Sequence, residues 1–314
     1  MRICSFLPSA TEIVFALGLG DELVGVTHEC DYPPEAQSKP VVISSAIDSK
    51  EHTSREIEEL TSSYFKQGKS IYTINMELLN ELKPDIVITQ ELCSVCAVPT
   101  DETLKAIEEL KPKPEVISLN PKNLGDIFND ILRVGEATGK KPEAEKLVTS
   151  LQGRVRRVES LGSGFKTHPR VFCMEWLDPP YSAGHWVPEM VKIAGGEDGL
   201  GKMGEPSFKV SWKDVFDYAP DFIVIMPCGF DINRTLEEID TVTSLKGWGS
   251  LPAVKKGQVY LVDANSYFSR PGPRIVNGLE VMTKIIHREL FELEVPQSSM
   301  LNLINLIRIE SYLG

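Results

Sequence analysis

Four of the six cysteines fall in loops that follow predicted strands, where their thiols are available for chemistry. Cys93 and Cys96 form a Cys-x-x-Cys pair, a spacing with which two thiolates reach one metal ion. If Cys30 and Cys228 converge on this pair, the four thiolates complete a shell for zinc or an iron–sulfur cluster. The alternative is that these cysteines are small buried hydrophobic residues, which is a common use of free cysteine.

A second set of candidates lies in a loop rich in proline and glycine after a predicted strand at 170–176. The rings of Trp176, Tyr181 and Trp186 suit stacking on a planar macrocycle, and a purely structural role is the alternative. His185 offers a neutral imidazole to a metal, or a side chain that caps the following helix. The loop is therefore a candidate ligand-binding element.

Charged residues supply a third set of candidates. Arg270 and Arg274 flank a Pro-Gly-Pro turn before the last predicted helix, and a guanidinium group suits phosphate or carboxylate, with surface ion pairing as the alternative. If the protein is instead a metalloenzyme, the acid–base groups would be drawn from a short set of side chains. That set is Glu29, Glu175, Asp178 and His185.

Short apolar strands alternate with helical periodicity over most of the chain, and these elements must position the candidates. The alternation predicts βαβ units and a mostly parallel sheet. Ser9 and Glu12 predict a capping box for a helix that runs to Leu17. The predicted strands are 2–6, 23–27, 85–90, 115–119, 170–176, 222–226 and 258–262, and the later predicted helices are 77–82, 101–110, 187–194, 212–218 and 273–290.

The stretch 123–161 has only helical spacing, and Pro142 reads as the first turn of a long helix. The sequence 82–88 (LKPDIVI) resembles 218–224 (YAPDFIV): each is a helix end, a Pro-Asp turn and a buried strand. The echo on either side of a helical stretch predicts two related α/β lobes. The expected domains are an N-terminal lobe (1–122), a helical segment (123–165, with a bridging helix at about 142–161), a C-terminal lobe (166–295) and a helical tail (296–314).

Composition excludes several classes of function. The 314 residues include 33 Lys+Arg and 45 Asp+Glu, so the net charge is −12, which gives no cationic surface for nucleic acid. No apolar run reaches the roughly 18 residues of a membrane span. The sparse cysteines and an N-terminus that lacks a secretory signal favour the cytoplasm, or a periplasmic or extracellular location if a native leader has been removed. No P-loop, Gly-x-Ser-x-Gly or dinucleotide fingerprint is present.

Several motifs are spread over nearly the whole chain: 6–13 (FLPSATEI), 24–33 (VGVTHECDYP), 82–88, 194–198 (AGGED) and 270–274 (RPGPR). Together they resemble the vitamin B12 and iron-siderophore binding proteins of ABC importers. The segment 175–189 is similar to a leaderless, cytosolic-looking branch of that family.

The resemblance implies a fold and a ligand site. It implies two Rossmann-like lobes, each a parallel sheet flanked by helices, bridged by one long rigid helix, with the ligand in a cleft between them. Ligands of open α/β sheets bind beyond the carboxyl ends of the strands. The ligand-binding residues expected on these grounds are Pro8, Ser9, Glu29, Trp176, Tyr181, His185, Trp186, Ser207, Arg270 and Arg274.

Two departures from the family pattern bear on ligand and partner. The B12 binders offer tryptophans from both lobes, and the matching places here hold Ile71 and Ser207, which implies a different ligand or a differently held one. These importers dock through one glutamate per lobe. Glu77 matches the first position, but Lys213, beside Asp214, occupies the second, which disfavours docking on an ABC permease.

Three functions follow as hypotheses. The first is a solute-binding protein without covalent chemistry, whose ligand is a corrinoid such as cobalamin or a ferric siderophore. The second is a cytosolic metalloprotein or enzyme with a zinc or iron–sulfur site held by the cleft cysteines. The third is an interaction protein whose partner recognises the closed lobes.

Overall fold

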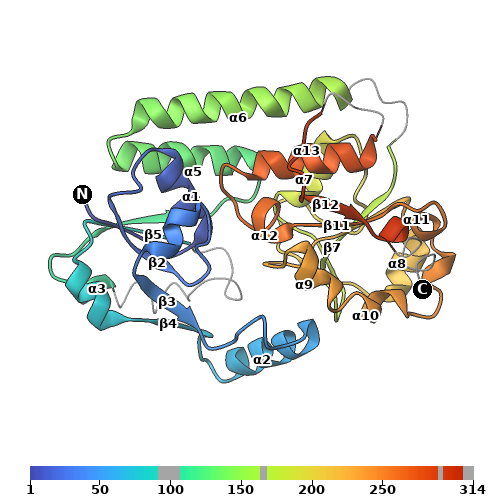
Figure 1. The fold of residues 1–314 in the computed structure, drawn as a ribbon, viewed down its shortest axis with the longest axis horizontal. Coiled ribbons are helices and arrows are strands. Elements are labelled where there is room, and N and C mark those ends of the chain that lie inside the picture. The colour runs from blue at the N-terminus through green and yellow to red at the C-terminus, as the bar shows by residue number, and fades with distance from the viewer. Residues whose placement is uncertain (91–106, 163–167, 289–292, 307–314) are drawn as a thin grey trace. The chain divides into compact units, whose positions relative to one another are not determined.

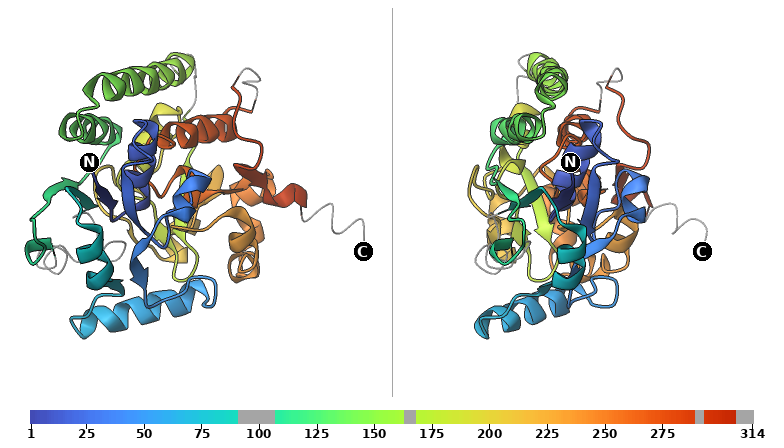
Figure 2. Two further views of the ribbon diagram at one scale, coloured as in Figure 1. Left: turned by 60° about the vertical axis from the view of Figure 1, so that its left-hand side comes forward. Right: turned by 90° about the vertical axis from the view of Figure 1, so that its left-hand side faces the viewer.

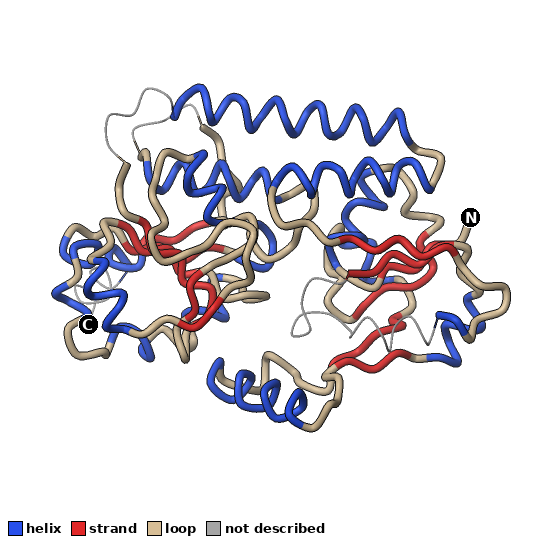
Figure 3. The backbone as a smooth tube through the Cα atoms, turned by 180° about the vertical axis from the view of Figure 1, so that it is seen from behind, coloured by secondary structure: helices blue, strands red, loops and turns tan. Residues whose placement is uncertain are grey.

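The computed structural model describes residues 1–90, 107–162, 168–288 and 293–306. The chain divides into two compact units. The N-terminal unit comprises Met1–His52, Glu56–Pro121 and Gly125–Ser150, and the C-terminal unit comprises Thr53–Arg55, Lys122–Leu124 and Leu151–Gly314. Each contains one six-stranded sheet with helices around it, so the α/β fold with two sheets is confirmed (Figure 3).

The sheet of the N-terminal unit has the order β4-β3-β2-β1-β5-β6. All neighbouring strands are parallel except the pair β3–β4. Strands β1, β2 and β3 can be followed in Figure 2. The strands are β1 (Ile3–Ser5), β2 (Leu23–Thr27), β3 (Val41–Ser45), β4 (Tyr72–Ile74), β5 (Ile86–Gln90) and β6 (Glu115–Leu119), and the helices are α1 (Pro8–Ala16), η1 (Pro34–Ser38), α2 (Ser54–Lys66), α3 (Met76–Leu82) and α5 (Leu124–Ala137).

The sheet of the C-terminal unit has the order β12-β11-β10-β7-β8-β9, with parallel pairing among β11, β10 and β7 only. Buried side chains of β7, β10 and β11, such as Phe172, Ile223 and Leu261, form its core. The strands are β7 (Val171–Trp176), β8 (Tyr181–Ser182), β9 (Phe208–Lys209), β10 (Phe222–Ile225), β11 (Val259–Val262) and β12 (Met300–Asn302). The helices are α7 (Val187–Ile193), α8 (Trp212–Tyr218), α9 (Ile232–Leu236), α10 (Asp240–Thr243), η2 (Trp248–Ser250), α11 (Pro252–Lys255), α12 (Ala264–Tyr267) and α13 (Ile275–Ile286).

The internal echo is confirmed as a structural repeat. Helices α3 and α8 both end on a residue in the left-handed conformation, and a Pro-Asp turn then leads into β5 or β10. Asp85 accepts a bond from the backbone N–H of Arg2, and Asp221 accepts one from that of Arg170. The two arginines also donate to the last carbonyls of α3 and α8. The same arginine–aspartate arrangement therefore lies before the first strand of each unit, β1 or β7.

The long helix is a single element, α6 (Lys141–Gly162), which Figure 1 shows as one straight helix. It contains the predicted 142–161 segment. Arg154, on its second half, donates to the two carboxylate oxygens of Glu280 on α13, at 2.9 and 2.5 Å. Because Glu280 is only 9% exposed, this bidentate pair fixes the end of α6 to the C-terminal unit. No helix among the described residues is long and apolar enough to span a membrane.

Two local predictions are wrong. Ser9 does not cap α1: the helix begins at Pro8, whose fixed φ and missing N–H suit the first position, so Ser9 lies inside the helix. The tail is not wholly helical, because Met300–Asn302 forms strand β12 and pairs antiparallel with β11, which satisfies the backbone groups of that edge.

Candidate functional site

The carboxyl end of β1 leads directly into α1 in the N-terminal unit. Strands β1 and β5 are neighbours in the sheet. The chain continues from β1 to β2 on one side and from β5 to β6 on the other, so the strand order reverses between β1 and β5. Open α/β sheets bind ligands at such a switch point. Pro8 and Ser9 form the first turn of α1 there. Ser9 is 2% exposed, and its hydroxyl has no hydrogen-bond partner among the described residues. The loop after β5 lies outside the described residues.

The loop after β2 carries an acidic residue and a cysteine at the same edge. Glu29 is exposed, and its backbone N–H bonds to the hydroxyl of Thr27. The Cys30 sulfur is buried between the hydroxyls of Thr11 and Thr27, at 3.1 and 3.3 Å. These contacts favour a structural role for this thiol.

Three loops meet at the carboxyl ends of β7, β10 and β11 in the C-terminal unit. The N–H of Cys228 bonds to the Glu175 carbonyl at 3.0 Å, and the N–H of Asn265 bonds to the Phe230 carbonyl at 3.0 Å. The hydroxyl of Ser269 accepts a bond from the N–H of Gly229 at 3.1 Å. These bonds connect the three loops to one another. We call this region the carboxyl edge; it is formed by residues 176–178, 228–230 and 263–270 together with the side chains of Arg234 and Glu238.

An aromatic pair stands at the centre of the carboxyl edge. The rings of Trp176 and Phe230 are 5.3 Å apart and tilted by 56°, a favourable geometry. The guanidinium of Arg234 lies 4.3 Å from the centre of the Phe230 ring, and Arg234 also pairs with Glu238. The sequence prediction missed Phe230, Arg234 and Glu238. The signal that could have found the last two is their spacing of four residues with opposite charges.

The segment Thr53–Arg55, which belongs to the C-terminal unit, lies on this edge. Ser54 donates both its backbone N–H and its hydroxyl to one oxygen of Glu238, each at 2.7 Å, and its carbonyl accepts the indole N–H of Trp176 at 3.0 Å. Arg55 forms two bonds with Asp178, at 2.8 and 3.0 Å. The predicted candidates Trp176 and Asp178 are thus brought together with a segment that the sequence did not connect with them.

The other aromatic candidates of the 176–186 loop make contacts within the C-terminal unit. Trp186 is 7% exposed and donates its indole N–H to the carbonyl of Phe268 at 2.8 Å. Tyr181, in β8, pairs with Trp176, and the Lys209 ammonium lies 5.7 Å from its ring centre. These contacts favour a structural role for both rings.

His185 does not cap the following helix, because α7 begins without a side-chain cap. It has a φ of 51°, and burial together with the charge of Lys122 lowers its pKa, so the neutral imidazole prevails. The backbone of Ser207 packs so closely on Gly184 that a Cβ there would lie 2.5 Å from the Ser207 nitrogen. Ser207 itself is half-buried just before β9.

The two arginine candidates differ in exposure. Arg270 is 6% exposed and donates to the side-chain oxygen of Asn265 at 2.8 Å, inside the carboxyl edge. Arg274 precedes α13 and is half-buried, with its guanidinium 5.7 Å from the Tyr267 ring centre. Arg270 is therefore a buried part of the carboxyl edge, and its role in ligand binding stays a prediction.

The proposed cysteine cluster stays a prediction. Cys30 lies in the N-terminal unit and Cys228, half-buried, in the C-terminal unit, while Cys93 and Cys96 lie outside the described residues. Within the described parts of the chain, no three His, Cys, Asp or Glu side chains are placed to hold one metal ion.

The two predicted docking positions lie on the repeated helices α3 and α8. Glu77 is exposed in the first turn of α3, and Ile71, at one of the family's tryptophan places, is buried. Lys213 is exposed on α8 and pairs with Asp217, which raises the pKa of its ammonium group. Asp214 is engaged in a capping box with Ser211. The acidic group next to Lys213 is thus committed to its own helix.

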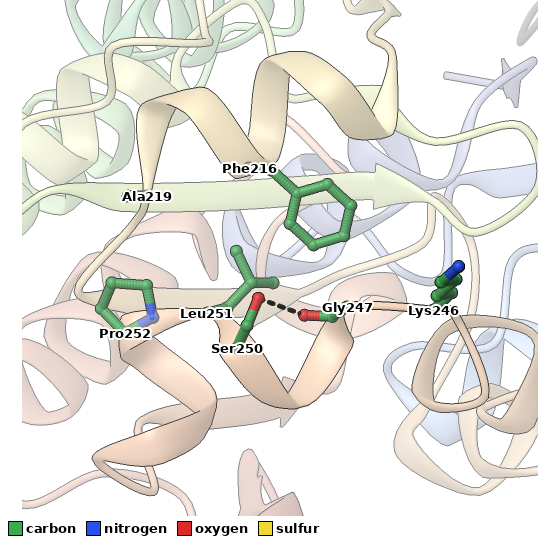
Figure 4. Close-up of a pocket in the computed structure, with 7 residues that line it drawn as sticks. All are labelled: Phe216, Ala219, Lys246, Gly247, Ser250, Leu251 and Pro252. Atoms are coloured by element: carbon green, nitrogen blue, oxygen red, sulfur yellow. Dashed lines mark hydrogen bonds between the residues drawn. The ribbon is translucent and has the colours of Figure 1, made fainter.

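A pocket of about 520 Å³ lies elsewhere in the C-terminal unit, under α8. Figure 4 shows the Phe216 ring facing Leu251 there, and the hydroxyl of Ser250 bonded to the carbonyl of Gly247. Because α8 and α11 lead into the amino ends of β10 and β11, this pocket is at the opposite edge of the sheet from Trp176 and is not the candidate ligand site.

Comparison with known proteins places this geometry in a family. The periplasmic binding protein model matches residues 3–266. An uncharacterized ABC transporter substrate-binding lipoprotein of Bacillus subtilis is 26% identical over 93% of this chain and 81% of its own length. A vitamin B12-binding protein of Vibrio parahaemolyticus is 25% identical over 88% of this chain and 86% of its own.

Among solved structures, the apo form of a periplasmic heme-binding protein from Roseiflexus has a TM-score of 0.69 at 23% identity, covering 92% of this chain and 98% of its own. The chain belongs to the periplasmic binding protein family. Its role is to bind a solute, and the resemblance inferred from the sequence motifs is confirmed.

Proposed function

We propose that this protein binds a metal-containing macrocycle or a ferric chelate, with a corrinoid such as cobalamin as the first candidate and a ferric siderophore as the second. The observation that carries the proposal is the half-buried ring of Trp176 at the carboxyl edge, which the buried Phe230 supports from behind, with the buried Arg270 in the same edge. An indole ring suits contact with a large flat ligand, and a guanidinium suits its anionic groups. The similarity to a vitamin B12-binding protein supports the corrinoid, and that to a heme-binding fold supports a macrocycle.

Titration of the purified protein with cyanocobalamin, hemin and a ferric hydroxamate siderophore tests the proposal. Trp176→Ala should weaken binding of the preferred ligand by about tenfold, the scale of one lost aromatic contact. Trp212→Ala is the matched control, because the ring of Trp212 contacts Trp248 and Phe216 and not Phe230. Equal affinity in the wild type and Trp176→Ala would remove the aromatic pair from the site.

We further propose an ABC permease as the partner, on the strength of the substrate-binding lipoprotein to which the chain is similar. Glu77 is exposed and suits an arginine of a permease, whereas Lys213 would repel one. Glu77→Lys should therefore abolish co-purification with permease-containing membranes, and unchanged co-purification would refute this contact.

A cytoplasmic location remains a second proposal, supported by the free thiols of Cys4, Cys30, Cys173 and Cys228 in the described chain. Cell fractionation tests it directly. Recovery in the envelope fraction would refute it and would favour the permease partner.

A further inference from the structure

The segment Thr53–Arg55 forms hydrogen bonds with the carboxyl edge through both backbone and side-chain groups. Ser54 gives an N–H and an O–H to Glu238 and takes the indole N–H of Trp176. Arg55 gives two N–H groups to Asp178. A short piece of chain thus satisfies two carboxylates and one indole in the place where the ligand is expected.

The segment Thr53–Arg55 occupies the polar groups with which the carboxyl edge would otherwise meet a ligand. Glu238 is 9% exposed, and a carboxylate that lost the Ser54 donors would need replacements, because burial without partners is costly. Both donors to Glu238 belong to Ser54, the first residue of α2. Arg55, by contrast, is 64% exposed at its side chain, so its pair with Asp178 is open to water and weak. The contact between Ser54 and Glu238 is therefore strong, and the contact between Arg55 and Asp178 is easily broken.

We propose that Thr53–Arg55 is a strap over the carboxyl edge, which the ligand displaces when it binds against Trp176. This inference rests on the proposed function. Ligand binding then competes with strap docking, and the observed affinity is lower than the intrinsic affinity by the fraction of molecules in which the strap is released.

The strap also indicates which ligand chemistry the edge accepts. Once it leaves, Arg234 still pairs with one oxygen of Glu238, while the other oxygen of Glu238 and the carboxylate of Asp178 lose the donors of Ser54 and Arg55. These acceptors match the amide N–H groups of a ligand, whereas a rim of carboxylates offers them no donor. The edge therefore selects an amide-rimmed macrocycle over a carboxylate-rimmed one.

Amide hydrogen exchange of the peptide that contains residues 53–56 reports strap release without reference to affinity. Dicyanocobinamide and dicyanocobyrinic acid are the probes, because they share the corrin ring and differ in amide against carboxylate side chains. Glu238→Gln should speed exchange in this peptide without ligand. Glu189→Gln is the matched control: it weakens the bond that the N–H of Leu124, at the start of another helix, donates to the Glu189 carboxylate.

Dicyanocobinamide should speed exchange at residues 53–56 and bind more tightly than dicyanocobyrinic acid. Arg55→Gln should tighten dicyanocobinamide binding by about two- to fivefold, the effect of removing one exposed ion pair from the competing state. Slower exchange on binding, or weaker binding by Arg55→Gln, would overturn the strap and leave the binding function standing. If Arg55→Gln binds dicyanocobinamide and the wild type does not, the result supports the strap. If neither the wild type nor Arg55→Gln binds it, the proposed ligand class is refuted, and the strap with it.

Discussion

Asp198 couples the stability of the C-terminal unit to pH. Its Oδ1 accepts the backbone N–H groups of Leu200 and Gly201, at 3.2 and 2.8 Å. Its Oδ2 is shielded from solvent and has no hydrogen-bond partner among the described residues. A Cβ at Gly201 would lie 2.5 Å from this oxygen, so only glycine permits the close turn. Burial raises the pKa of Asp198 to about 7, and the two N–H donors offset only part of this effect.

The direction of the pH dependence follows from this raised pKa. An unfolded aspartate has a pKa of about 3.9, so between about pH 4 and pH 7 the folded protein keeps a proton that the unfolded chain releases. The stabilisation is complete below about pH 4 and is lost as pH rises through about 7. Three pKa units at about 1.4 kcal/mol each give an upper bound of about 4 kcal/mol in the free energy of unfolding.

Urea unfolding of the wild type and Asp198→Asn at intervals from pH 4.5 to 8.5 measures this effect. The difference between the two free energies of unfolding should move in favour of the asparagine variant as pH rises, because asparagine carries no charge to bury. Asp214→Asn is the control of opposite sign: its hydrogen bonds with Ser211 lower the pKa of Asp214, so that stabilisation is lost as pH falls. Parallel pH–stability curves for wild type and Asp198→Asn would refute the reasoning.

Two further predictions concern the stability of the fold, the first through a buried ion pair and the second through a close backbone contact. Arg154→Met should lower the free energy of unfolding by about 1–3 kcal/mol, because Glu280 is left as a buried unpaired carboxylate, and the double variant with Glu280→Met should recover most of the loss in urea titrations; an equal loss in the double variant would contradict this. Gly184→Ala should cost more than about 1 kcal/mol, since its Cβ would lie 2.4 Å from the carbonyl oxygen of Glu205, whereas Gly249→Ala meets open space. Thermal unfolding compares the two, and equal melting temperatures would refute the steric argument.

Much of the fold could be predicted because its signals are local. Alternating strands and helices, and the Pro-Asp turns at 84–85 and 220–221, are properties of neighbouring residues. Strand β12 could not be predicted in this way, because three residues become a strand only through pairing with β11. Strand β4, also three residues long, owes its form to β3 in the same manner.

The candidate site was predictable only in part. The loop after β7 and its Trp176 follow from the rule that ligands bind at carboxyl ends of strands. The partners of that loop could not be predicted, since Ser54 and Glu238 are 184 positions apart in the sequence. Trp186 was predicted to bind ligand because it lies in the loop after β7. Its ring is instead buried, with the indole N–H bonded to the carbonyl of Phe268, a contact that no sequence pattern indicates.

The central claim is that this family member holds a metal-containing macrocycle or ferric chelate at the carboxyl edge. The most direct measurement is an absorbance spectrum with elemental analysis of the untagged protein, purified without oxygen and then titrated with cyanocobalamin, hemin and a ferric siderophore. The account predicts saturable one-to-one binding of one of these ligands, with cobalt or iron found at the same ratio. Stoichiometric zinc, or iron with inorganic sulfide, in a protein that binds none of them would contradict the account and would favour a metal site held by cysteines.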